Sequence, residues 1–148
     1  MKLREQMPEL TGATEWINEE ITMDELKGKA TLIHFWSVSC HLCKEAMPEI
    51  NELRDEYDDD LNVIAVHMPR SEDDLDMGVI RSMAMGHDIT QPIFVDSEHK
   101  LTEAFENKYV PAYYVFDEEG KLRHFQAGGS GMKMLKKRIN RVLGIEEK

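Results

Sequence analysis

The chain has 148 residues, of which 41% are hydrophobic and 32% charged, a composition typical of one soluble globular domain with a buried core. Its 29 acidic residues outnumber its 18 Lys and Arg, so the formal net charge is -11. This balance excludes nucleic acid as an expected partner, because phosphate binding needs a basic surface. No run approaches about 18 apolar residues, so we expect no membrane span and predict a single domain over 1–148.

The chain begins with charged and polar residues, and no apolar stretch follows them. A secretory signal needs such a stretch, so we predict that the protein works in the cytoplasm. Small-thiol buffers keep most cysteines reduced in that compartment.

Hydrophobic periodicity predicts alternating strands and helices, and this alternation favours an α/β layer architecture. In chain order the expected elements are a strand near 15–17, a strand at 31–36, a helix at 41–57, a strand at 61–66, one helix within 69–91, a strand at 92–96, a helix at 98–108, strands at 112–116 and 121–126, and a last helix capped by Gly144. The helix within 69–91 is expected to bury Leu75, Val79, Ile80 and Met83, and the helix at 98–108 to bury Leu101, Ala104 and Phe105. The short turn at 117–120 predicts an antiparallel hairpin.

Both cysteines of the chain, Cys40 and Cys43, lie two residues apart where the strand at 31–36 gives way to a helix. A cysteine at the first turn of a helix faces unpaired backbone N–H groups and the positive end of the helix dipole, which stabilise a thiolate. We therefore predict that Cys40 attacks a substrate disulfide and that Cys43 resolves the mixed disulfide. A protonated His41 between them would stabilise the thiolate further.

Three other interpretations compete with a redox dithiol. The pair could be half of a zinc site completed by two of six scattered histidines, although zinc usually takes four ligands and no second Cys pair exists. Peroxide reduction is disfavoured because Ile33 and Ser37 stand where a peroxiredoxin needs Pro and Thr. The third is a non-enzymatic binding module that holds a partner or a metal through Cys40 and Cys43.

The segment around the dithiol resembles the active site of the thioredoxin superfamily, and within it the TlpA/ResA-like thiol–disulfide oxidoreductases. The resemblance rests on the strand 32–36, the Cys-x-x-Cys followed by Pro48, the segment 109–117 with its Val-Pro, and the Gly-Lys of the hairpin turn. It implies a thioredoxin-like fold with a central mixed sheet flanked by helices. It also implies that the region 69–96 is an αβ insertion before the half that contains a cis-proline.

The resemblance further implies that the Val110–Pro111 bond is cis and that the backbone of Val110 pairs with a substrate strand. Trp36, His41 and Leu42 complete the expected substrate-binding set. No Gly-rich dinucleotide loop follows a strand, so we expect no bound cofactor. Electrons would come from a separate reductase or a thiol pool, and we expect a monomer without a metal.

The sequence departs from this family at three positions. Ser39 replaces the Trp that commonly precedes the first Cys. His34 stands where thioredoxins place a buried Asp, so it is a candidate proton relay; the alternative is a hydrogen-bonded core histidine. Glu72 is the nearest candidate for the acidic residue that ResA-type relatives carry after the second strand; the alternative is a residue near the start of the next helix. The sequence thus predicts a thiol–disulfide oxidoreductase that reduces protein or small-molecule disulfides.

Overall fold

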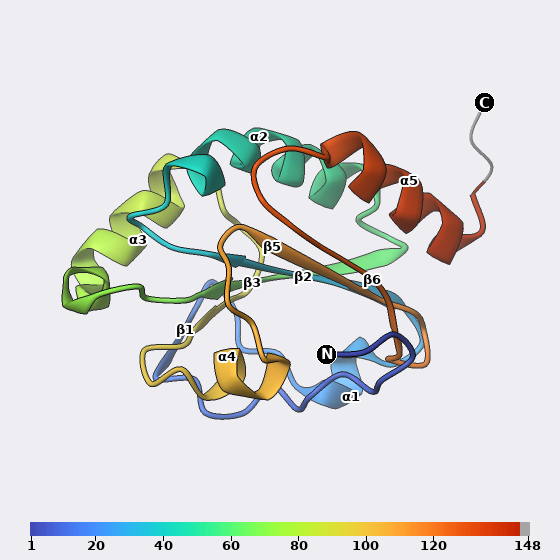
Figure 1. The fold of residues 1–148 in the computed structure, drawn as a ribbon, viewed down its shortest axis with the longest axis horizontal. Helices are drawn as coiled ribbons and strands as arrows, with labels where there is room; N and C mark the ends of the chain where they lie inside the picture. Colours follow the sequence, from blue (N-terminus) through green and yellow to red (C-terminus); the bar gives the residue numbers. More distant parts are fainter. Residues whose placement is uncertain (146–148) are drawn as a thin grey trace.

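The computed structural model describes residues 1–145 and consists of a six-stranded mixed sheet with helices on both faces (Figure 1). The strands are β1 (Glu15–Ile17), β2 (Ala30–Trp36), β3 (Leu61–His67), β4 (Ile93–Val95), β5 (Ala112–Phe116) and β6 (Leu122–Ala127). The helices are α1 (Met23–Leu26), α2 (His41–Glu56), the 3-10 helix η1 (Glu72–Leu75), α3 (Met77–Gly86), α4 (Lys100–Phe105) and α5 (Met132–Leu143). The last three residues of the predicted domain, 146–148, lie outside the described residues.

The strand order is β1-β4-β3-β2-β5-β6. The β2–β3 and β3–β4 pairs are parallel, whereas β1–β4, β2–β5 and β5–β6 are antiparallel. This arrangement confirms the predicted mixed sheet and the predicted hairpin. The parallel β2–β3 pair needs a crossover, which α2 supplies, so β2 delivers the dithiol to the N-terminus of α2.

The central strand β2 is buried along its whole length because helices cover both sheet faces. Ile33 and Phe35 pack into a core with residues of α1 and α4, below the sheet in Figure 1. Leu32 and Trp36 point to the opposite face, where residues of α2, α3 and α5 cover them. A strand that is apolar on both faces is what the sequence pattern predicted.

The helix predicted within 69–91, between β3 and β4, is interrupted. It is split into η1 and α3, and the side chain of Asp76 caps α3 by accepting hydrogen bonds from the N–H groups of Gly78 and Val79 at 2.9 and 3.2 Å. The restart changes which side chains face the sheet. The expectation that Leu75 and Val79 are buried is therefore wrong, since both are exposed, and Ile80 and Ala84 fill the inner face instead.

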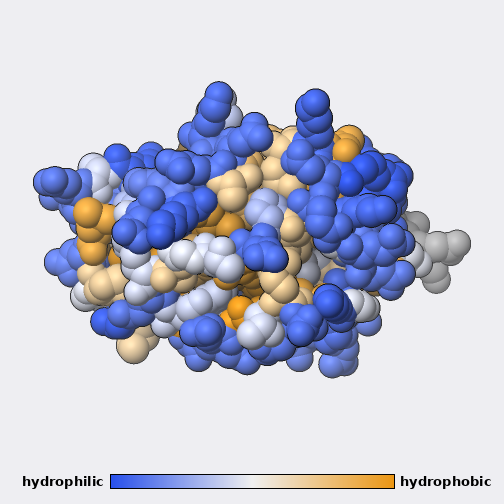
Figure 2. Space-filling model, turned by 90° about the horizontal axis from the view of Figure 1, so that it is seen from below, coloured by the Kyte–Doolittle hydropathy of each residue, from blue (hydrophilic) through white to orange (hydrophobic). Residues whose placement is uncertain are grey.

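The helix α4 is shorter than predicted, and the expected burial of Ala104 is wrong because this residue is exposed. The buried carboxylate of Asp96 accepts hydrogen bonds from the N–H groups of Leu101 and Thr102, which fixes the first turn. Glu106 adopts a left-handed conformation and ends the helix. Figure 2, which views the molecule from the side of α1 and α4, shows a mostly hydrophilic face with small hydrophobic areas between charged side chains. Across residues 1–145, no helix combines the length and apolar character that a membrane crossing requires.

Candidate redox-active site

Cys40 and Cys43 form a disulfide at the start of α2, with their Cα atoms 5.3 Å apart. Cys40 is the N-cap residue of the helix, and its Sγ accepts a hydrogen bond from the Cys43 N–H at 3.1 Å. An N–H group directed at this sulfur, together with the helix dipole, stabilises negative charge on it once the disulfide is reduced. Cys40 is 3% exposed and Cys43 1% exposed. The geometry therefore suits the predicted roles of an attacking Cys40 and an inner Cys43.

Leu42 in the first turn of α2 and two loop segments, Val110–Pro111 and Gly128–Gly129, form what we call the platform next to the dithiol. The Val110–Pro111 peptide bond is cis, as the resemblance implied. Val110 packs against the hydrophobic cluster that contains both cysteines, and the Gly128 N–H donates to the Pro111 carbonyl at 2.9 Å. A Cβ atom at Gly129 would lie 3.1 Å from the Leu42 side chain, so the Gly128–Gly129 loop approaches the first turn of α2 closely.

Asn107 positions the segment that precedes Pro111. Its side-chain amide donates to the Tyr109 carbonyl at 2.8 Å and its carbonyl accepts from the Tyr114 hydroxyl at 2.9 Å. Because Tyr114 lies on β5, the segment is tied to the sheet. On the platform, Leu42 is 49% exposed and the neighbouring Tyr109 58% exposed. This apolar surface is available to a partner of the dithiol.

One member of the predicted substrate-binding set, Trp36, lies elsewhere than expected. Trp36 is buried in the cluster beneath the two cysteines, so it supports the dithiol and does not face substrate, which corrects the sequence-based expectation. His41 is exposed between the two cysteines, and its Nε2 lies 2.9 Å from the carboxylate of Glu45 one turn later on α2. Leu42, Val110 and Pro111 are the members that the structure brings together around the cysteines.

His34 is a hydrogen-bonded core histidine. Its Nε2 lies 2.9 Å from the amide nitrogen of Gln91, and the amide oxygen of Gln91 accepts a hydrogen bond from Arg54 at 2.8 Å. The amide therefore donates to His34, which leaves the imidazole proton on Nδ1. Burial, reinforced by the charge of Arg54, lowers the pKa of His34 to about 3. An imidazole that remains neutral at physiological pH does not suit the proton-relay role that its position suggested.

The buried acidic residue beside the dithiol is Asp74, which the sequence did not single out. Glu72, the residue that was proposed, is exposed at the start of η1. Asp74 accepts hydrogen bonds on one carboxylate oxygen from the hydroxyls of Ser37 and Ser39 and from the Arg70 N–H, at 2.8–2.9 Å. Burial alone would raise the pKa of Asp74, but these hydrogen bonds outweigh it and hold the pKa below its ordinary value.

His67 closes the other side of the loop that leads to Cys40. Its Nε2 accepts a hydrogen bond from the Val38 N–H at 3.2 Å, and its ring lies edge-on to Trp36 with centroids 5.0 Å apart. Burial lowers the pKa of His67 to about 4, although the nearby Asp74 carboxylate opposes the shift. A neutral His67 thus anchors the backbone two residues before the nucleophile.

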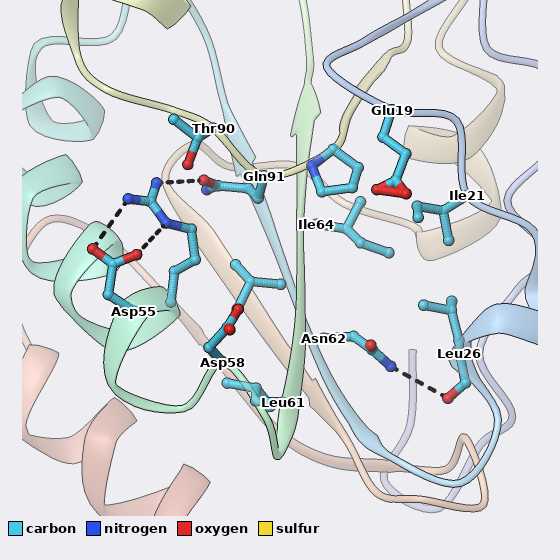
Figure 3. Close-up of a pocket in the computed structure, with 13 residues that line it drawn as sticks. Glu19, Ile21, Leu26, Asp55, Asp58, Leu61, Asn62, Ile64, Thr90 and Gln91 are labelled. Atoms are coloured by element: carbon cyan, nitrogen blue, oxygen red, sulfur yellow. Dashed lines mark hydrogen bonds and ion pairs between the residues drawn. The ribbon is translucent and has the colours of Figure 1, made fainter.

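The described residues were also compared with the zinc-site interpretation of the cysteine pair. Within residues 1–145, no group of three or more His, Cys, Asp or Glu side chains is arranged to hold an ion. A cavity of about 330 Å³ lies at the start of β3 (Figure 3), and the residues that line it include Asp55, Asn62 and Gln91. None of the predicted site residues lines this cavity. This cavity is therefore separate from the dithiol and the platform.

A dithiol at the junction of a central strand and a helix, beside a cis-proline on a mixed sheet, defines a thioredoxin-like protein with a redox-active disulfide. The comparisons agree with this class. A family model described as the AhpC/TSA family matches residues 3–125. The chain is 72% identical to the thiol-disulfide oxidoreductase YkuV of Bacillus subtilis, over 99% of this chain and 100% of the relative.

Two further comparisons are consistent with this fold. A solved structure, the solution structure of a thioredoxin-like protein in the oxidized form, has 72% sequence identity and a TM-score of 0.91, and covers 99% of this chain and 100% of its own. The thiol-disulfide oxidoreductase ResA of Bacillus cereus is 24% identical, over 82% of this chain and 68% of the relative. The chain belongs to the AhpC/TSA family and is a thioredoxin-like thiol–disulfide oxidoreductase.

Proposed function

We propose that this oxidoreductase acts in the cytoplasm as a monomeric reductant of protein disulfides. The Cys40 thiolate attacks one sulfur of a substrate disulfide, which forms a mixed disulfide and releases the other substrate sulfur as a thiolate. The Cys43 thiolate then attacks Cys40 Sγ, which releases the second substrate thiolate and closes the Cys40–Cys43 disulfide. Two electrons pass from the dithiol to the substrate, and a separate reductase or thiol pool restores the dithiol.

The observation that supports a protein substrate is the platform. Leu42 and Tyr109 are both about half exposed next to buried sulfurs, so a substrate gains most by bringing apolar surface of its own along with its disulfide. A small disulfide covers little of this surface. We therefore favour protein over small-molecule disulfides.

The cysteine content supports the direction and the compartment. Both cysteines of the chain are in the dithiol, so none remains for the structural disulfides that are common in oxidising compartments. This usage is typical of a protein that is reduced by its surroundings and passes the electrons on.

Insulin reduction tests the proposal. The parent protein, supplied with a dithiol reductant, should accelerate the reduction of insulin more than that of oxidised glutathione, whose leaving thiol is also an alkyl thiol, at the same disulfide concentration, and Cys40→Ser should abolish both accelerations. If Cys40→Ser reduces insulin as well as the parent does, the mechanism is wrong. Equal accelerations for the two substrates would contradict the preference for proteins.

The binding-module interpretation makes a different prediction. A protein that only holds a partner or a metal would show no catalytic turnover of insulin with either cysteine present. It would also retain stoichiometric zinc or copper after gentle purification. Catalytic reduction without bound metal would leave the enzyme as the supported function.

A further inference from the structure

The loop that carries Cys40 out of β2 is held by two oppositely charged side chains from the segment after β3. The Oδ2 atom of Asp74 accepts hydrogen bonds from the hydroxyls of Ser37 and Ser39 at 2.9 and 2.8 Å. Arg70 reaches the same loop from outside, where its Nε donates to the Ser39 hydroxyl at 3.1 Å. Ser39 thus bridges the guanidinium and the carboxylate. We call Arg70, Asp74 and this serine bridge the clamp.

The carboxylate side of the clamp is buried and charged. Asp74 is 2% exposed, and three hydrogen bonds converge on its Oδ2. Such hydrogen bonds stabilise the ionised form, so a fixed negative charge lies beside the loop. This charge disfavours a second negative charge nearby.

The guanidinium side of the clamp acts on the nucleophile's own peptide group. A terminal nitrogen of Arg70 donates to the Ser39 carbonyl at 2.6 Å. That carbonyl belongs to the peptide bond that continues into the N–H of Cys40, so the positive charge is held one residue from the sulfur-bearing Cα. A positive charge at this distance favours a thiolate.

We propose that the clamp is a tuning device for the dithiol, in which Arg70 stabilises the Cys40 thiolate and Asp74 opposes it while both fix the loop. Within residues 1–145, the side-chain hydrogen bonds of Arg70 and Asp74 involve Ser37, Ser39 and the Arg70 N–H and not the Cys40 sulfur, so both are positioning residues. The hydroxyl of Ser39 links the two charges, since it donates to Asp74 and accepts from Arg70. The inference rests on the proposed role of Cys40 as the nucleophile.

Other charged and titratable side chains lie on the elements that neighbour the Cys40 loop, and none of them is hydrogen-bonded to Ser39 among the described residues. They are His67 on β3, Glu72 and Asp73 on η1, His41, Lys44 and Glu45 on α2, and Lys108 and Tyr109 before Pro111. His41 Nε2 and the Glu45 carboxylate contact each other at 2.9 Å. His67 is held neutral by burial, since its pKa is lowered to about 4. The clamp therefore differs from these groups in being hydrogen-bonded to the residue that precedes Cys40.

The test is a thiolate titration in the Cys43→Ser background, where Cys40 is the one titrating thiol, followed by ultraviolet thiolate absorbance and by alkylation rate. Arg70→Gln should raise the Cys40 pKa and Asp74→Asn should lower it, each by on the order of half a unit. Loosening of the loop alone would shift both variants in the same direction. Shifts of the Cys40 pKa in opposite directions therefore indicate an effect of the removed charges and not of a loosened loop.

Matched controls remove the same charges elsewhere. Asp73→Asn changes an exposed neighbour on η1, and Arg81→Gln changes an arginine on α3 that pairs with Glu15. Both should leave the Cys40 pKa within error of the parent. Arg70→Lys keeps the charge, so its pKa should lie closer to the parent than that of Arg70→Gln.

Two results would overturn the proposal: shifts of the same sign in Arg70→Gln and Asp74→Asn, or shifts no larger than those of the controls. Because Arg70 is exposed, its variants test the proposal even if Asp74→Asn does not fold. The readout is a pKa and not turnover. If the clamp proposal fails, the proposed reductase activity is unaffected. If the parent protein does not reduce insulin, the proposed function itself is wrong.

Discussion

The two buried histidines of the central strands, His34 on β2 and His67 on β3, should make the stability of the oxidised protein strongly dependent on pH below neutrality. The pKa of His34 is lowered from 6.5 to about 3 and that of His67 to about 4. In the unfolded chain both imidazoles take up a proton near pH 6.5. Their stabilising contribution is therefore complete above that pH and is lost as the pH falls towards the folded-state values.

The size of the effect follows from the two pKa values. Between about pH 7.5 and about pH 5, the unfolded state gains close to one proton per histidine while the folded state gains almost none. Each residue then lowers the free energy of unfolding by about 2 kcal/mol over this interval, or about 4 kcal/mol together. The disulfide removes both thiols from the titration, which simplifies the interpretation.

Urea denaturation of the oxidised protein at the two pH values measures this loss. His34→Gln, which replaces the imidazole with a non-titrating amide, should lose about 2 kcal/mol less than the parent does between the same pH values, and so should His67→Gln. The comparison uses the difference between two pH values within each variant, so a lower stability at neutral pH does not affect it. An equal loss in the parent and in His34→Gln would refute the assignment of His34 as a buried neutral residue.

Three further outcomes test the packing around the site. Leu135→Ala, in the buried face of α5, should lower the free energy of unfolding by about 2–5 kcal/mol in urea denaturation, and a loss below 1 kcal/mol would contradict the packing. Asp76→Ala removes the cap of α3 and should cost about 1 kcal/mol in the same assay, with no change in insulin reduction. Gly129→Ala places a methyl group 3.1 Å from the Leu42 side chain and should raise KM for insulin several-fold at an unchanged Tm. The control Gly86→Ala adds a methyl group that meets nothing within 4 Å, and it should leave KM for insulin unchanged.

The elements that position the dithiol could be predicted because their signals are local. An apolar run with both faces buried identified β2, and residues recurring at three- and four-residue steps identified α2. The Cys-x-x-Cys spacing then placed the two sulfurs at the helix start. The turn at 117–120 was sufficient for the hairpin, because so short a connection permits only antiparallel strands.

The residues around the dithiol were harder to predict because their roles depend on distant partners. Three acidic residues in succession occupy 72–74, and only the turn of η1 determines that Asp74 is buried while Glu72 is exposed. His34 is held by Gln91, 57 residues later in the chain. In a strand that is buried on both faces, the sequence cannot tell whether Trp36 lies beneath the site or lines its surface.

The most direct test of the central claim, that Cys40 attacks and Cys43 resolves, is trapping with Cys43→Ser. Incubated with oxidised insulin, this variant should accumulate a covalent adduct whose cross-linked peptide contains Cys40, as identified by mass spectrometry before reduction. The reciprocal Cys40→Ser variant, whose remaining thiol is the more buried one, should form little or none. Equal adduct formation by the two variants, or none by Cys43→Ser, would contradict the division of labour between the two sulfurs.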